Sequence, residues 1–290
     1  MFRPFSLNLG GVLHEYSRPV VMGIINVTPD SFYAGSRTWT DAEIEKRAES
    51  LAADGADMID VGAYSSRPGA GDVSVAEEID RLRRGVEAIH RGAPGVPVSV
   101  DTFRAAVAVA AVEEMGVDIV NDISGGDMDD DMARVVARMG VPYILMHMRG
   151  TPATMQSLTD YPGGDVTAGV LGELSSKVER MAQAGVSDII VDPGFGFAKT
   201  LDQNYDLLRN LGLMHSLGRP VLVGVSRKSM ITRPLGITPD EALPGTVAVN
   251  TIALLQGASI LRVHDVAAAC QAVAIVERTT AILPLYTTIP

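Results

Sequence analysis

The chain has 290 residues, of which 47% are hydrophobic and 20% are charged, and this composition is typical of a folded protein with a large core. Its net charge of -11, from 24 basic and 35 acidic residues, argues against a broad nucleic-acid-binding surface, because such a surface needs clustered positive charge. The sequence shows no secretory signal and no apolar run near the ~18 residues that span a bilayer, and a single cysteine, Cys270, excludes an internal disulfide. We therefore expect a cytoplasmic protein that binds neither nucleic acid nor membranes.

Short runs rich in β-branched residues alternate with amphipathic patterns along the chain. The short runs predict strands at 20–26, 58–62, 97–101, 118–121, 142–147, 188–192, 220–226 and 260–263. The amphipathic patterns predict helices at about 41–54, 75–91, 104–115, 130–139, 168–185, 201–215, 240–257 and 266–282. Several of these helices end at a glycine, which favours the left-handed cap conformation.

Eight βα units in succession, with strands apolar enough to be buried on both faces, predict an α/β fold. We expect a single (β/α)8 TIM barrel of parallel strands, with the active site at the strand C-terminal face. An open doubly wound sheet is the alternative, and the even spacing of the units favours closure. No linker or shift in composition divides the chain, so residues 1–290 are expected to form one domain. The connections 27–40 and 63–74 are unusually long and carry polar motifs, which indicates a function.

Polar residues stand at the end of each predicted strand. These segments are 26–32, 62–69, 99–102, 121–124, 146–152, 192–199, 226–229 and 262–265. Taken singly, an Asp or Asn in this position is often only a cap of the next helix, and this explanation applies to Asp101 and Asn121. Because the carboxyl ends of parallel strands meet on one face, the segments together indicate one composite ligand site.

Three segments are specific in combination: Asn-Val-Thr-Pro-Asp-Ser-Phe at 26–32, Asp-Pro-Gly-Phe-Gly-Phe at 192–197 and Ser-Arg-Lys-Ser at 226–229. In this order and spacing they resemble the dihydropteroate synthase family of pterin-binding TIM barrels, over nearly the whole chain. The resemblance implies a transferase of folate biosynthesis. Such an enzyme condenses 6-hydroxymethyl-7,8-dihydropterin pyrophosphate with p-aminobenzoate and releases 7,8-dihydropteroate and pyrophosphate. It also implies a homodimer and competitive inhibition by sulfonamides, which mimic p-aminobenzoate.

The resemblance assigns the pterin to a set of strand-end residues: Asp101, Asn121, Met146, Asp192, Phe197, Lys228 and Arg262. Asp192 would accept two parallel N–H bonds from the amide-like edge of the pterin, a strong charge-assisted arrangement. Lys228 would donate to a pterin acceptor, and Arg262 would stack on the ring. Met146 and Phe197 would be apolar walls.

The leaving pyrophosphate is assigned to Asn26, Arg67, Arg262 and His264. Arg262 and His264 precede the last helix, whose N-terminal amides favour an anion. Asn26 would hold Mg²⁺ against the pyrophosphate oxygens, in keeping with a metal ion that retains much of its water shell. The resemblance makes Arg67, Lys228, Arg262 and His264 the catalytic residues. We expect a dissociative mechanism in which pyrophosphate leaves before the amine attacks.

By the same resemblance, p-aminobenzoate would lie between Phe32 and Pro68, with Ser66 and Ser226 at its carboxylate and Arg67 bridging toward pyrophosphate. The sequence departs from the family at two places in this region. Position 66 is more often Thr in the family, and Ser keeps the hydroxyl. Ala34 replaces a loop carboxylate that helps to close the site, so the details of loop closure are open.

Two alternative functions share the pterin contacts. A pterin-binding methyltransferase domain would have Asp101, Asn121 and Asp192 but not the segments 65–68 and 226–228, which are present here. A catalytically silent pterin-binding homologue would have lost a phosphate-binding residue, whereas all four remain.

Overall fold

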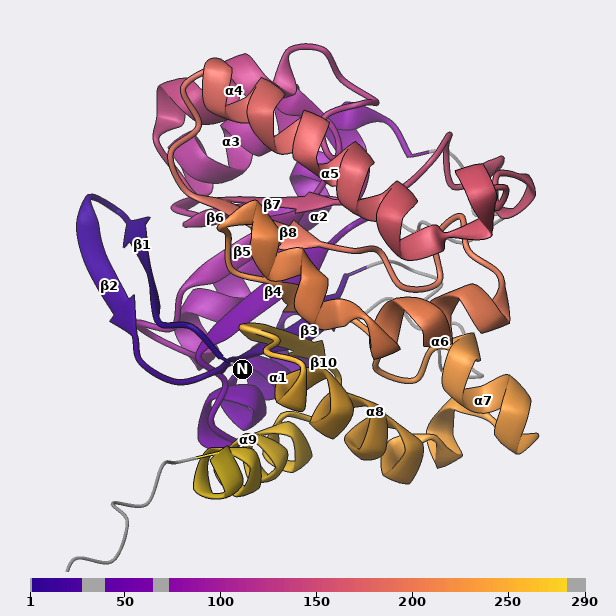
Figure 1. The fold of residues 1–290 in the computed structure, drawn as a ribbon. Coiled ribbons are helices and arrows are strands. Elements are labelled where there is room, and N and C mark those ends of the chain that lie inside the picture. The colour runs from indigo at the N-terminus through magenta and orange to yellow at the C-terminus, as the bar shows by residue number, and fades with distance from the viewer. Residues whose placement is uncertain (1, 28–39, 65–72, 281–290) are drawn as a thin grey trace, which may run out of the picture.

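The computed structural model describes residues 2–27, 40–64 and 73–280. Eight strands form one sheet: β3 Val20–Asn26, β4 Met58–Gly62, β5 Val98–Asp101, β6 Ile119–Asp122, β7 Tyr143–Met146, β8 Ile189–Asp192, β9 Leu222–Val223 and β10 Ile260–Val263. Nine α-helices occur in the described residues: α1 Asp41–Ala53, α2 Val75–Gly92, α3 Ala105–Met115, α4 Met132–Met139, α5 Val166–Gln183, α6 Leu201–Arg209, α7 Ser229–Leu235, α8 Leu243–Leu255 and α9 Val266–Thr280. The helices surround the sheet (Figure 1).

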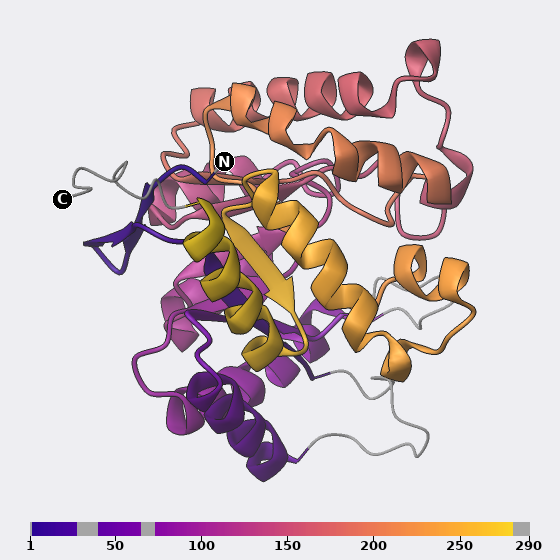
Figure 2. The same cartoon turned by 60° about the horizontal axis from the view of Figure 1, so that its bottom comes forward.

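The sheet is parallel and closes into a barrel. Its strand order is β8-β7-β6-β5-β4-β3-β10-β9, and a parallel bridge between Val191 and Val221 joins the two end strands. In Figure 2 the arrow of β10 runs between α8 and α9. The predicted (β/α)8 barrel is therefore confirmed, and the open doubly wound sheet is wrong.

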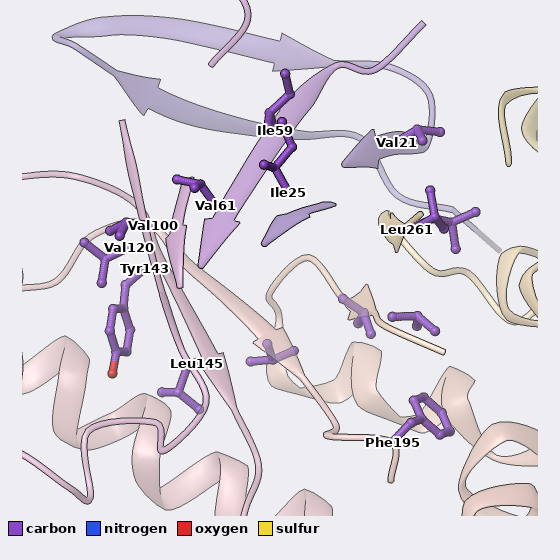
Figure 3. Packing of buried hydrophobic residues seen from close by; sticks show 14 of the residues in the cluster. Val21, Ile25, Ile59, Val61, Val100, Val120, Tyr143, Leu145, Phe195 and Leu261 are labelled. Atoms are coloured by element: carbon purple, nitrogen blue, oxygen red, sulfur yellow. The ribbon is translucent and has the colours of Figure 1, made fainter. Parts of the chain in front are cut away.

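Successive side chains of each strand point alternately outward and inward and belong to two different hydrophobic clusters. Those that point outward, such as Val21, Ile59 and Leu145, are buried beneath the helices and form the main cluster (Figure 3). Those that point inward at the amino-terminal end of the barrel form a second cluster, which includes Met22 and Ile190. This burial on both faces explains why the strands read as continuous apolar runs.

An N-terminal hairpin that was not expected from the sequence covers one end of the barrel. It pairs β1 Phe5–Leu9 with β2 Val12–Tyr16 in antiparallel register (Figure 1). Leu7 and Leu9 are buried in the same cluster as Met22 and Ile190. Alternating apolar residues around Gly10-Gly11 are a recognisable hairpin pattern.

Other boundaries also differ from the sequence predictions. The expected helix 201–215 is α6 followed by the 3₁₀ helix η3 Leu211–Leu217, and the expected helix 240–257 is the 3₁₀ turn η4 Pro239–Glu241 followed by α8. Helix α7 was not predicted at all, because its seven residues include Pro234. Strand β9 has only two residues instead of the expected 220–226. Among the described residues, no helix is long and apolar enough to cross a membrane.

Candidate active site at the carboxyl ends of the strands

The strand registers bring the predicted site residues into one layer at the carboxyl end of the barrel. Asn26 pairs with Gly62, Gly62 with Asp101, and Asp101 with Asn121. Farther around the barrel Met146 pairs with Asp192. Side chains at paired positions of parallel strands point to the same face, and here that face is the barrel interior.

Arg262 is the centre of this layer. From β10 its Nη2 lies 2.6 Å from Oδ2 of Asp60 and 3.1 Å from Oδ2 of Asp101, and its Nε donates to Oδ2 of Asp60 at 2.7 Å. Asn121 Nδ2 donates to the same oxygen of Asp60 at 3.1 Å. Asp60, which is fully buried, thus holds two of the residues assigned to the pterin.

Asp60 was not among the residues expected from the sequence. It occupies the middle of β4, Met-Ile-Asp-Val-Gly, where it is the one charged residue of a buried strand. A buried carboxylate is stable only when it is paired and hydrogen-bonded, so this position alone indicates a partner. The partner, Arg262, lies 202 positions away in the chain and could not be identified before the barrel was known.

Two further carboxylates face Arg262. Burial raises the pKa of Asp101 to about 7, against the opposing charge of Arg262. Burial also raises the pKa of Asp192, and the positive charge of Lys228 opposes that shift. Oδ1 of Asp192 accepts a hydrogen bond from the N–H of Gly194 at 2.7 Å. Burial therefore disfavours the charged form of both carboxyl groups, and N–H donors from a ligand would stabilise that form.

Lys228 reaches the same region from the start of α7. Its Nζ donates to the carbonyl oxygen of Phe195 at 2.6 Å and lies 4.8 Å from the centre of the Phe197 ring. Burial lowers the pKa of Lys228 to about 8, and Asp192 opposes this change. Met146 is buried in an apolar cluster against which Phe197 packs. These contacts place Lys228 and Phe197 side by side next to Asp192.

His264 lies beside Arg262, just before α9. Its Nδ1 is 3.0 Å from Oγ of Ser226, and its peptide N–H donates to the same hydroxyl at 3.3 Å. Its carbonyl oxygen accepts from Nη2 of Arg47 at 2.5 Å, a contact that the sequence did not indicate. Burial, followed by the charges of Arg262 and Arg227, lowers the pKa of His264 to about 4. Ser226 is thus in contact with both the ring and the peptide N–H of His264.

The remaining predicted residues, Phe32, Ser66, Arg67 and Pro68, lie outside the described residues, as does Ala34. Asn26 is described at the end of β3, where a Cβ at Gly62 would lie 3.6 Å from its Oδ1. Within the described ranges there is no group of three His, Cys, Asp or Glu side chains that could bind a metal by itself.

A cavity of about 550 Å³ lies beside the loop after β8. It is lined by this loop, by the connection after β7 and by α6 and α7, with Gly196, Lys199 and Ser229 among its residues. A Cβ at Gly196 would lie 3.5 Å from Cδ of Lys228, so the cavity and the strand-end layer share this loop.

The comparisons with known proteins agree with this geometry. Residues 22–264 match the family model described as pterin binding enzyme. The dihydropteroate synthase of Escherichia coli K12 is 42% identical over 271 residues, covering 93% of this chain and 94% of that protein. The dihydropteroate synthase of Synechocystis is 43% identical over 272 residues, covering 92% and 93%.

Solved structures give the same result. The Yersinia pestis dihydropteroate synthase, solved with a sulfonamide drug, has a TM-score of 0.88 at 40% identity and covers 95% of this chain and 99% of its own. The Xanthomonas albilineans enzyme, solved with 4-aminobenzoic acid, has a TM-score of 0.87 at 37% identity, with coverages of 96% and 99%. The chain therefore belongs to the dihydropteroate synthase family of pterin-binding enzymes.

Proposed function

We propose that this protein is a dihydropteroate synthase, a transferase that joins 6-hydroxymethyl-7,8-dihydropterin pyrophosphate to p-aminobenzoate. The observation that carries the proposal is the convergence of Asp101, Asp192, Lys228 and Arg262 at the carboxyl end of the barrel. Relatives named for this reaction match over nearly all of the chain. The sulfonamide in the Yersinia pestis structure and the 4-aminobenzoic acid in the Xanthomonas albilineans structure support the same substrate class.

The polar groups of this layer complement a pterin. Asp192, with Asp101 and Asn121, offers acceptors to its N–H groups, and Lys228 offers a donor to its carbonyl or ring nitrogen. Arg262, held from below by Asp60, keeps its guanidinium plane in a fixed orientation for stacking. Met146 and Phe197 would exclude water from the ring.

Arg262 and His264 would bind the departing pyrophosphate, together with Arg67. Asn26 suits a Mg²⁺ ion whose other ligands are water and pyrophosphate oxygens, because its amide oxygen lies at the open end of the barrel beside Gly62. Bound there, the ion would neutralise charge on the leaving group. His264, neutral in the ligand-free protein, can take up a proton beside that anion.

The reaction would be dissociative. The bond between the pterin methylene carbon and the pyrophosphate oxygen breaks first, and the electron pair leaves with pyrophosphate. The resulting methylene cation is delocalised into the electron-rich pterin. The amine of p-aminobenzoate then forms the new carbon–nitrogen bond and loses a proton, so no protein nucleophile is required.

p-Aminobenzoate would bind above Lys228 and Phe197, with Phe32, Ser66, Arg67 and Pro68 completing its site, and Ser226 is the candidate for its carboxylate. Sulfonamides would compete for this position.

The cytoplasm is the proposed location of the protein, since the single cysteine suits a reducing compartment.

A homodimer would form through an exposed apolar surface made by η3, α7 and α8. Leu213, Leu235, Ile252 and Leu255 are each more than a third exposed on it. The three elements lie close to one another. A Cβ built at Gly212 of η3 would lie 3.2 Å from Oε1 of Gln256 after α8, and one built at Gly245 of α8 would lie 3.3 Å from Cδ1 of Leu235 in α7. Light scattering on Leu255→Asp should show a monomer, whereas Ile275→Asp on α9 should remain a dimer. A monomeric wild type would contradict the assignment.

The deciding experiment measures pyrophosphate release from the pterin substrate with Mg²⁺, with and without p-aminobenzoate, and identifies the pterin product. Formation of 7,8-dihydropteroate is the expected result. Tight pterin binding without this product would instead favour the silent homologue or the methyltransferase domain.

A further inference from the structure

Lys199 is a buried lysine that the proposed reaction does not use. Its Nζ donates to the carbonyl oxygens of Gly194 and Phe197, both at 2.9 Å, and lies 3.1 Å from Nδ1 of His147. Only 4% of the residue is exposed. Three acceptors match the three hydrogens of an ammonium group, so every donor of this buried group is satisfied.

The lysine is anchored by a network that ends in a carboxylate. His147 is fully buried, and its Nε2 lies 3.0 Å from Oε2 of Glu173. Because a carboxylate only accepts, Nε2 carries the hydrogen and Nδ1 presents its lone pair to Lys199. Burial lowers the pKa of His147 to about 4, which keeps the ring neutral. Partial burial raises the pKa of Glu173, but hydrogen bonds from His147 and Arg149 outweigh this effect and lower the pKa to about 2.

The segment that Lys199 clamps, 193–199, is an irregular connection between β8 and α6. Gly194, Gly196 and Ala198 all have left-handed backbone conformations, with φ of 70°, 83° and 50°. A Cβ at Gly194 would lie 2.0 Å from the carbonyl oxygen of His147, so only glycine fits there. Ala198 holds a conformation that a residue with a side chain adopts at a cost, and the surroundings must maintain it.

Buried side chains bind the carbonyl groups of this loop one after another. Lys199 takes those of Gly194 and Phe197, Lys228 takes that of Phe195 at 2.6 Å, and the hydroxyl of Tyr161 takes that of Ala198 at 3.0 Å. The loop is therefore fixed by side-chain donors instead of by regular secondary structure.

The same loop carries two elements of the pterin site: the N–H of Gly194 on Asp192, and the Phe197 ring beside Lys228. Lys199 itself lines the cavity of about 550 Å³ beside this loop. We propose that Lys199, anchored through His147 to Glu173, is a positioning residue that fixes Asp192 and Phe197 for pterin binding. This inference rests on the proposed function of the strand-end layer.

The test compares Lys199→Met with Lys177→Met. Lys177 is a matched control, because it is also buried, donates to a loop carbonyl (Ser124, 2.7 Å) and pairs with an aspartate (Asp127, 2.7 Å), but its loop follows β6. Lys199→Met should raise Kd and KM for dihydropterin pyrophosphate about tenfold or more, equivalent to ~1.4 kcal/mol. It should also speed amide hydrogen exchange at 193–200. Lys177→Met should lower Tm to a similar extent but leave pterin Kd within about twofold.

Pterin binding by Lys199→Met at the wild-type Kd, or an equal loss of binding in both variants, would overturn the inference. A wild type that does not bind the pterin substrate would instead overturn the proposed function. If Lys199→Met does not fold, Glu173→Gln tests the same network from its partly exposed end. That variant should weaken pterin binding by a smaller factor and speed exchange in the same loop, and an unchanged Kd there would contradict the positioning role.

Discussion

Asp60 and Arg262, which lie 202 positions apart in the chain, form a buried ion pair in which one carboxylate oxygen accepts from both Nε at 2.7 Å and Nη2 at 2.6 Å. The same oxygen accepts from Asn121. The Asp60 carboxylate therefore fixes the positions of the Arg262 guanidinium and the Asn121 amide relative to a ligand.

Removal of Asp60 should be costly, because Arg262 would keep its charge in a buried site. Asp60→Ala should lower the free energy of unfolding by about 3–5 kcal/mol, measured by urea denaturation. Arg134→Ala breaks the exposed pair with Asp131 and should cost under about 1 kcal/mol. A similarly small loss for Asp60→Ala would contradict a buried, interdependent pair.

The pH dependence of activity should have an acid limb from Asp101, whose pKa is raised to about 7 by burial. The ionised carboxylate accepts stronger, charge-assisted hydrogen bonds than the protonated acid, so kcat/KM should rise with pH toward about 7. It should fall again above about 8, as Lys228 loses its proton. Asp101→Asn should have a lower kcat/KM and no acid limb from this group. An acid limb unchanged in this variant would assign it to another residue.

The contribution of Asp101 to the stability of the ligand-free protein should fall as the pH rises, whereas its contribution to activity should rise. The native state holds a proton on Asp101 up to about pH 7, whereas the unfolded carboxyl loses it near its ordinary value of 3.8. Between these values the native state binds more protons, so the contribution of Asp101 to the free energy of unfolding falls as the pH rises. Urea titrations of wild type and Asp101→Asn at pH 4.5 and 7 would isolate this contribution.

Arg262 and His264 should act on the leaving group. The double substitution Arg262→Ala/His264→Ala should reduce pyrophosphate release by at least about 10²–10³-fold, the effect of losing a donor that stabilises developing charge. His264→Ala alone preserves the Asp60–Arg262 pair, so its circular dichroism should match the wild type while its rate falls. A normal rate in the double variant would remove both residues from the proposed mechanism.

The barrel could be predicted from sequence because its strands and helices are local patterns of hydrophobicity. The elements that were missed obey weaker local rules. The hairpin 5–16 has a visible Gly-Gly turn, but its burial depends on the open end of a barrel that forms later in the chain. Helix α7 is too short, and too close to Pro234, to give a helical period.

The site residues also fall into a group that the sequence predicts and a group that it does not. Residues at strand ends could be named because the ends of parallel strands converge, and a family resemblance gave them roles. Asp60 and His147 act through partners that are remote in sequence, Arg262 and Glu173, and no local pattern identifies such pairs. The side chains of 28–39 and 65–72 lie outside the described residues, so the contacts assigned to Phe32, Ser66, Arg67 and Pro68 stay predictions.

The N-terminal hairpin should contribute to stability but not to catalysis. Leu7 is buried at the amino-terminal end of the barrel, opposite the strand-end layer. Leu7→Ala should cost about 2–5 kcal/mol of unfolding free energy with an unchanged KM for the pterin substrate. Leu13→Ala, on the exposed side of the hairpin, should change stability by less than about 0.5 kcal/mol. A raised KM in Leu7→Ala would mean that the two ends of the barrel are coupled.

Gly224 should determine the space available to the pterin. A Cβ at this position would lie 3.9 Å from Oδ2 of Asp192 and 4.0 Å from Cβ of Arg262, so the ligand-free protein can accommodate a methyl group without a clash. Gly224→Ala should therefore fold with wild-type stability or slightly more, yet bind dihydropterin pyrophosphate about tenfold or more weakly. Gly172→Ala in α5, where the Cβ would meet no atom of the described residues within 4 Å, should stabilise the protein by up to about 1 kcal/mol without affecting binding. Isothermal titration with the pterin substrate distinguishes the two variants. Wild-type affinity in Gly224→Ala would show that the ring does not lie between Asp192 and Arg262.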